Sequence, residues 1–364
     1  MRVIATEVAV AGRHSMSRTL DPRTRPVNAL RRFATRCYAR QQAYPEGSAM
    51  DEQFESRPLL SPEVLGTLIT RRTLPSLVRL SVHLGAFTGV IASIVVNAER
   101  AWLCAPLSIA LAWIWSALFA PFHECTHRTA FRSLVGNHLG AWLTGVPFGM
   151  APSVYRTFHY EHHRYTQDLE KDPELTGAPH YAAWPPSILT WLIANSGYGL
   201  LLLKLRPLFG FAIKPQAHWG SFARWAPRID DPARLVLECR IVLGCWLVFI
   251  VAAWSGVPGG GWLLFAAWFT HVFQSLWLAA EHTGLPHSGT ILARTRSVVT
   301  TPFVQFWLWN MNFHAEHHGW PSIPWHQLPT THRAVTPQLE SLVPGYVALH
   351  RGVLSGETLP RGGP

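Results

Sequence analysis

The stretch LCAPLSIALAWIWSALFAPFHECTH, residues 103–127, is the most informative part of the sequence for the class of fold. Residues 103–122 carry no charged side chain. They match the length of about 20 residues that an α-helix needs to cross the hydrocarbon core of a bilayer. The last five residues, HECTH, hold two histidines and an acid. A histidine-rich segment therefore follows directly on a predicted membrane-spanning helix.

The composition of the whole chain agrees with a membrane protein. Hydrophobic residues make up 48% of it and charged residues only 14%, against about 25% charged in a typical soluble domain. The five cysteines show neither paired spacing nor a CxxC pair, so no disulfide framework or cysteine zinc site is expected. The net charge of +10 comes without an aromatic-basic nucleic-acid motif, so we expect basic loops at a membrane face and no nucleic-acid partner.

Four apolar stretches reach the length of a membrane span. They are residues 80–96, 103–122, 235–254 and 261–280. Short joints connect them in pairs, namely residues 98–102 and the sequence SGVPGGG at 255–261. We therefore expect two helical hairpins.

Lysine and arginine orient these hairpins. Nearly all of them lie in the N-terminal region, in residues 128–234 and in the C-terminal region. By the positive-inside rule these three segments face the cytoplasm. The shorter apolar stretches at 138–150 and 188–203 are broken by Gly, Pro or Asn, and we expect them to lie at the membrane interface. The predicted fold is an all-α integral membrane protein with four transmembrane helices, interfacial helices and a cytoplasmic histidine-rich cap.

Three regions are expected along the chain. Residues 1–76 form a basic region, predicted to be partly disordered because its first 49 residues hold nine arginines and only three acids. A true start at Met50 is an alternative that would remove most of this region. Residues 77–332 form the predicted membrane domain, and residues 333–364 a C-terminal tail.

Eight of the nineteen histidines fall into three clusters with helical spacing, HECTH, HYEHH and HAEHH. They are His123, His127, His159, His162, His163, His314, His317 and His318. On a helix, HxxxH places two imidazoles on one face, whereas the last two histidines of HxxHH splay apart by about 100°. Such a splay suits two metal ions better than one. Eight imidazoles also exceed the four ligands that zinc takes, although imidazole alone does not identify the metal.

The predicted topology places the three clusters together. The first follows the span at 103–122, the third follows the span at 261–280, and the second lies in the basic segment between the hairpins. All three therefore fall on the same predicted face of the membrane, which indicates one convergent site.

Two other readings of these residues remain open. HECTH matches the HExxH signature of zinc metalloproteases, in which Glu124 would be the general base, but this leaves HYEHH and HAEHH unexplained. A metal transporter would need ionisable residues inside the spans. Only Glu238, Arg240 and His271 meet that condition.

The clusters and their flanks resemble the membrane fatty acid desaturase family. The stretches that carry the resemblance are HECTHRTAF, FHYEHHRYTQDLEKDPEL and NMNFHAEHHGWPSIPWHQLP. The resemblance covers residues 77–332, and the superfamily also holds sphingolipid desaturases, carotenoid hydroxylases and ketolases. It implies an O2-dependent centre of two non-haem iron ions that removes hydrogen from an unactivated C–H bond of a fatty acyl or related lipid chain.

The resemblance also implies the metal ligands. The eight clustered histidines carry over as ligands, and His282 in AAEHTG stands where the family often adds one more. His271 and His287 are further candidates, and His271 would otherwise make an interhelical hydrogen bond. Acids beside the ligands are candidates for orienting them, because metal-bound histidine usually donates its other N–H to a carboxylate or carbonyl. These acids are Glu124, Glu161, Glu281, Glu316, Asp168 and Asp172.

The reaction class and the electron supply follow from the same resemblance. Desaturation gives a double bond, whereas a hydroxylase or ketolase on the same scaffold adds oxygen, and both would use the same ligands. Neither an HPGG signature of cytochrome b5 nor a cysteine cluster for an iron–sulfur centre occurs. We therefore expect an external electron donor of ferredoxin or cytochrome b5 type, which an acidic surface would steer to the basic face.

Overall fold

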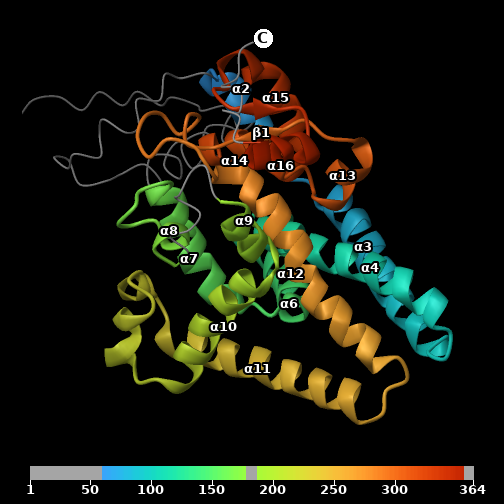
Figure 1. Cartoon of the computed structure of the whole chain (residues 1–364). Helices are drawn as coiled ribbons and strands as arrows, with labels where there is room; N and C mark the ends of the chain where they lie inside the picture. The colour runs from blue at the N-terminus through green and yellow to red at the C-terminus, as the bar shows by residue number, and fades with distance from the viewer. Residues whose placement is uncertain (1–59, 178–186, 356–364) are drawn as a thin grey trace, which may run out of the picture. The chain divides into compact units, whose positions relative to one another are not determined.

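The computed structural model describes residues 60–177 and 187–355 (Figure 1). The basic segment expected before residue 60, with the alternative start at Met50, lies outside the described residues. In chain order the α-helices are α2 (Pro62–Leu68), α3 (Thr73–Val96), α4 (Ala101–Ala117), α5 (Phe119–His127), α6 (Leu134–Phe148), α7 (Pro152–Tyr165), α8 (Pro173–Gly177), α9 (Ile188–Asn195), α10 (Tyr198–Ile213), α11 (Pro232–Ser255), α12 (Gly260–His282), α13 (Pro302–Trp307), α14 (His314–Gly319), α15 (Leu328–Val335) and α16 (Tyr346–Ser355). The short 3₁₀ helices are η3 (Gln216–Ser221), η4 (Ala226–Arg228), η5 (Trp325–Gln327) and η6 (Thr336–Gln338), and the strands are β1 (Ser297–Val298) and β2 (Leu342–Val343).

Among the described residues, four helical segments are long and apolar enough to span a membrane. They are Thr73–Val96, Ala101–His127, Pro232–Ser255 and Gly260–His282. Each contains one predicted span and extends beyond it. The second joins α4 and α5 and therefore continues through HECTH, and the fourth ends on His282. The described part is mostly helical, and its only sheet is a pair of two-residue parallel strands.

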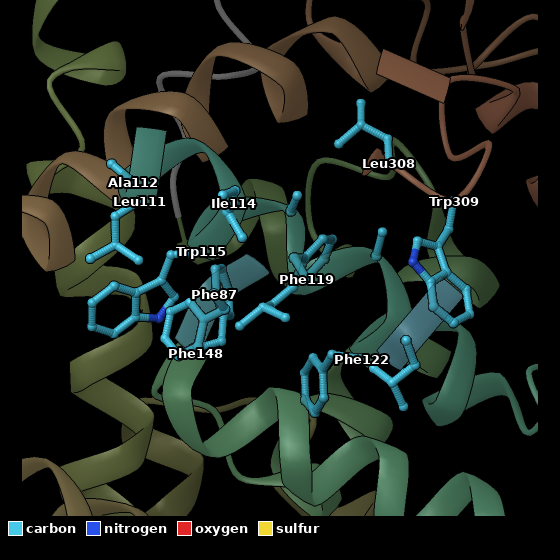
Figure 2. Close-up of a cluster of buried hydrophobic side chains, with 14 of the residues drawn as sticks. Phe87, Leu111, Ala112, Ile114, Trp115, Phe119, Phe122, Phe148, Leu308 and Trp309 are labelled. Carbon is cyan, nitrogen blue, oxygen red and sulfur yellow. The ribbon is translucent and has the colours of Figure 1, made fainter. Parts of the chain in front are cut away.

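The core of the bundle lies between α4 and α12, which make the most extensive helix–helix contact among the described elements (Figure 1). The indole of Trp113 on α4 meets the rings of Phe273 and Trp277 on α12 at centroid distances of 5.5 and 5.3 Å. Figure 2 shows how this buried cluster continues from α4 into Phe119 and Phe122 on α5. Helix α5 thus enters the protein interior instead of ending at a surface.

Helices α3 and α11 are more exposed than α4 and α12. Their exposed residues are largely aliphatic, for example Val78 and Val82 on α3 and Leu247 and Val251 on α11. A helix that stays apolar on its outer face is suited to contact with lipid. The four apolar helices therefore indicate a multi-pass membrane protein.

The two shorter apolar stretches also form helices. Residues 138–150 lie mainly in α6, and residues 188–203 lie in α9 and α10. Helices α9 and α10 are bent by 51° at a short break, and together they are long and apolar enough for a broken span. Their placement at the membrane interface stays a prediction.

The segments after α12 gather near its C-terminal end (Figure 1). Strand β1 pairs with β2 through Ser297–Leu342 and Val298–Val343. The described part of the expected C-terminal tail, residues 333–355, packs on the bundle: α16 contacts α12, and the His350 Nε2 atom lies 2.8 Å from the carbonyl oxygen of Leu276. The three-region division of the chain stays a prediction.

The close approach of α11 and α12 depends on one glycine at their joint. A Cβ atom added to Gly260 would lie 1.9 Å from the carbonyl oxygen of Ala253 on α11. A Cβ atom on the next residue, Gly261, would have no heavy atom within 4 Å. Replacing Gly260 therefore tests the packing contact, and replacing the neighbouring Gly261 tests the general effect of losing a glycine in this helix.

We expect Gly260→Ala to destabilise the protein by about 1–3 kcal/mol, because the clash involves main-chain atoms that cannot move independently. Thermal unfolding of the detergent-solubilised protein measures this effect. The matched Gly261→Ala variant should unfold at or slightly above the wild-type temperature, since alanine favours helix. Equal unfolding temperatures for the two variants would contradict the predicted contact.

Candidate metal centre

Helix α5 carries His123 and His127 into the interior, where all nine of its residues are buried. The helix ends at His127, and the left-handed backbone of the next residue, Arg128 (φ 61°), turns the chain. The Glu124 carboxylate accepts hydrogen bonds from the Thr129 hydroxyl at 2.7 Å and the Trp325 main-chain N–H at 3.2 Å. Glu124 therefore ties α5 to its own C-terminal turn and to η5.

The nine predicted ligands lie in two groups. The first holds His123, His127, His159, His163 and His317, and the second holds His162, His282, His314 and His318. Within each group the candidate ligand atoms all lie within 4.8 Å of one another. The predicted set thus comes together completely, with His282 among it.

Helices α7 and α14 each contribute to both groups. His162 and His163 are adjacent in sequence but belong to different groups, and so are His317 and His318. This division follows from the rotation of about 100° per helical residue. The rings of His163 and His318 stack at 4.1 Å between centroids, which places the two groups side by side.

The imidazole nitrogens face one another inside each group. In the first group, Nε2 of His159 lies 2.8 Å from Nε2 of His127 and 3.0 Å from Nε2 of His163. In the second, Nε2 of His282 lies 3.2 Å from Nε2 of His162 and 2.9 Å from Nε2 of His314. One proton can form a hydrogen bond in only one such pair of nitrogens. Most of the converging nitrogen lone pairs therefore face no hydrogen-bond donor.

Burial keeps most of these imidazoles neutral. It lowers the pKa of His159, His163, His314 and His318, and neighbouring histidines lower it further. Burial also lowers the pKa of His317 to about 3, with a contribution from His162. Neutral imidazole is the form that binds a metal. Both ring nitrogens of His123 and the Nε2 atom of His318 lack a hydrogen-bond partner among the described residues, so the residues present fit a pair of metal ions.

His162 is oriented by a carboxylate. Its Nδ1 atom lies 3.0 Å from Asp172 Oδ1, and Asp172 Oδ2 also accepts the Gln167 main-chain N–H at 2.8 Å. Burial acts to lower the pKa of His162, but Asp172, with Glu174 and Glu281, outweighs it and raises the pKa to about 9. The Nδ1 proton is thus held by Asp172, and Nε2 is the position at which a metal would displace a proton.

The other candidate carboxylates differ in the groups that they contact. Glu316 bonds to His332 and Ser297, and Glu161 pairs with Arg164 at 2.6 Å. Asp168 accepts hydrogen bonds from the main-chain N–H groups of Glu170 and Lys171 and has no hydrogen bond to a histidine among the described residues. Glu281 Oε2 lies 3.6 Å from His314 Nε2. Among these acids and Asp172, only Asp172 directly hydrogen-bonds a predicted ligand.

The two further candidate histidines lie outside both groups. His271 Nε2 lies 3.0 Å from Lys204 Nζ on α10, which is the interhelical hydrogen bond considered as its alternative role. His287 Nδ1 lies 3.1 Å from the carbonyl oxygen of Gln167.

Three residues that the sequence analysis did not single out position His282. Its Nδ1 lies 3.1 Å from the Arg294 carbonyl oxygen, and Gln167 Nε2 donates to the His282 carbonyl at 2.7 Å. The buried guanidinium of Arg296 donates to the carbonyls of Ala280 and Thr283 and so caps the end of α12. Two arginines within the otherwise uncharged segment ILARTRSVV, residues 291–299, were the available signal.

The comparisons with known proteins agree with this geometry. A sequence model described as fatty acid desaturase matches residues 100–350. The chain is 23% identical to a sphingolipid delta(4)-desaturase of Candida albicans, over 60% of this chain and 58% of that protein. It is 25% identical to a putative sphingolipid delta(4)-desaturase/C4-monooxygenase of Caenorhabditis elegans, over 61% and 55%, and 22% identical to a fatty acid desaturase of Bacillus subtilis, over 62% and 66%. The matched part thus spans somewhat more than half the length of these relatives.

We expect Asp172→Asn to weaken metal binding by about 10- to 100-fold, because the amide no longer fixes the proton on His162 Nδ1. The metal content per chain, measured after dialysis against increasing chelator, reports this loss. Asp168→Asn removes a carboxylate from the same loop without touching a histidine and should retain metal like the wild type. Equal retention by both variants would refute the role of Asp172.

Proposed function

The chain belongs to the fatty acid desaturase family, and on that premise we propose that it is an O2-dependent di-iron desaturase that introduces a double bond into a fatty acyl or related lipid chain. The observation that carries the proposal is the convergence of nine imidazoles in two adjacent groups of five and four. Desaturase relatives and four apolar helices support a lipid-acting oxidoreductase in a membrane.

The two histidine groups would hold one iron ion each. Two bound iron ions would supply the chemistry that couples the reduction of O2 to the removal of hydrogen from a C–H bond. The protein holds their ligands rigidly: Asp172, the Arg294 carbonyl and the Thr166 hydroxyl lie at the outer nitrogens of His162, His282 and His318. Burial of the histidines excludes water from the centre.

A small, mostly apolar cavity borders the second group, and this is where the substrate chain is proposed to approach the centre. It lies between α5, α12 and the segment before α14, and its lining includes Phe119, Trp277, Leu308 and Met311. A hydrocarbon chain gains free energy on burial against such side chains. A wall of fixed aromatic rings would also decide which carbon lies near the metal.

A hydroxylase or ketolase on the same scaffold is the alternative. One relative carries both activities in its description, desaturase and C4-monooxygenase, and both outcomes would use the same ligands. The zinc protease alternative has less support, because the Glu124 carboxylate is held by Thr129 and Trp325 and three further imidazoles surround the HECTH pair in place of an open zinc site.

The active site is proposed to face the cytoplasm, with both hairpin joints on the other side of the membrane. The basic segment 128–234 contains α7, and the C-terminal basic segment contains α14. The positive-inside rule places both on the cytoplasmic side. The histidines of α7 and α14 would then meet those at the ends of α5 and α12.

Reduction of one O2 to two waters takes four electrons, of which desaturation supplies two. The other two are proposed to come from an external donor of ferredoxin or cytochrome b5 type. A basic face beside the first group suits an acidic donor: Arg156 donates to the Thr126 carbonyl at 3.4 Å and lies over the ring of Tyr160, which contacts the ring of His127.

Expression in a host of known lipid profile tests the reaction. Mass spectrometry of total lipids should reveal a product two hydrogens lighter than its precursor, and both His162→Ala and His317→Ala should abolish it, since each removes a ligand from a different group. His218→Ala, which replaces an exposed histidine on η3, should leave the product. Hydroxylated product would favour the alternative, and product from both ligand variants would overturn the proposed centre.

The purified enzyme tests the donor. Turnover should require an added donor and its reductase, and it should fall as ionic strength rises because the steering is electrostatic. Sustained turnover with lipid and O2 alone would contradict an external donor.

A further inference from the structure

Glu281 stands apart from the other acids near the centre. It is the residue before His282 on α12, and its side chain is 15% exposed in the apolar cavity. Within residues 60–177 and 187–355 its carboxylate makes no hydrogen bond. Its Oε2 atom lies 3.6 Å from His314 Nε2. A carboxylate in apolar surroundings without a partner is costly, so its position calls for a ligand.

Glu281 also differs from the other acids in which ring nitrogen of a histidine its carboxylate approaches. Asp172 approaches His162 at Nδ1, whereas the Nε2 atom of His162 faces His282. Glu281 approaches His314 at Nε2, the nitrogen that also faces His282 Nε2 at 2.9 Å. Asp172 therefore lies behind its ligand, whereas Glu281 lies at the side on which the ligand atoms converge.

The distance fits binding to a common ion. Two atoms that bind one ion at about 2.1 Å are roughly 3.0–3.4 Å apart for bond angles of 90–109°, so a small side-chain movement closes the 3.6 Å separation. Carboxylates combine with imidazoles on non-haem iron in the two-histidine, one-carboxylate sites. The second group has four imidazoles where the first has five.

We propose that Glu281 is a tenth metal ligand, which binds the ion of the four-histidine group from the cavity side. This rests on the proposed function. The carboxylate gives that group five protein ligands and one negative charge, whereas the five-histidine group has only neutral ligands. The two ions therefore differ in charge environment, and the one that carries the anionic ligand is the one bordering the cavity.

A Glu281→Gln variant tests the assignment, because the amide keeps the shape of the side chain and removes the anionic ligand. The full-length protein, purified in detergent and loaded anaerobically with ⁵⁷Fe(II), is examined for iron per chain and by Mössbauer spectroscopy. We expect one of the two ferrous signals to change while the other stays, and the affinity for one iron to fall by at least about 10-fold.

Glu174→Gln is the matched control. Glu174 Oε2 lies 3.8 Å from Nδ1 of His162 in the same group, a distance like that of Glu281 but on the outer side. This variant should keep two irons and the wild-type spectrum. A change of equal size in both variants would show a general charge effect and overturn the assignment.

The remaining outcomes separate the two proposals. If Glu281→Gln binds two irons with an unchanged spectrum, Glu281 is no ligand, and loss of lipid product in that variant would then assign it to a polar group of the substrate. If the wild-type protein takes up no iron, the di-iron function itself fails. Wild-type iron content is therefore measured first.

Discussion

The centre depends on the rotation between adjacent residues of a helix. His162 and His163 on α7, and His317 and His318 on α14, point into different groups because neighbouring side chains diverge by about 100°. Two short helices thus supply both groups, and their rigid geometry sets the spacing between them. Neither group is complete without both helices, so the fold must bring α7 and α14 together before either site exists.

The ends of two membrane helices position the remaining histidines of the centre. Helix α5 continues the direction of the α4 span into the interior, and α12 ends on His282. Contact between α4 and α12 therefore brings the first histidine cluster close to the ninth histidine. The aromatic contacts of Trp113 with Phe273 and Trp277 act at a distance from the centre, yet they fix the relative position of the ligands at the helix ends.

Periodicity and spacing predicted much of this arrangement. The four spans and the splay of HxxHH follow from local rules, and the local rules were sufficient because each histidine cluster lies on a single helix. The family resemblance supplied His282, which has no neighbouring histidine to mark it. Arg294, Arg296 and Gln167 could not be predicted, because their hydrogen bonds join segments that are between 12 and 128 residues apart or cap a helix end from a following loop.

The roles of the acids beside the histidines could not be predicted from the sequence. Glu124, Glu161, Glu281 and Glu316 each stand next to a predicted ligand, and the sequence treats them alike. Glu124 and Glu316 have partners far along the chain or in a later helix, Trp325 and His332, whereas Glu161 pairs with Arg164 one helical turn away. The Glu281 carboxylate makes no hydrogen bond among the described residues; it borders the cavity and lies 3.6 Å from His314 Nε2. Adjacency to a histidine in the sequence thus does not predict the role of an acid. Tertiary packing determines whether its carboxylate hydrogen-bonds to the rest of the protein or lies at the metal site.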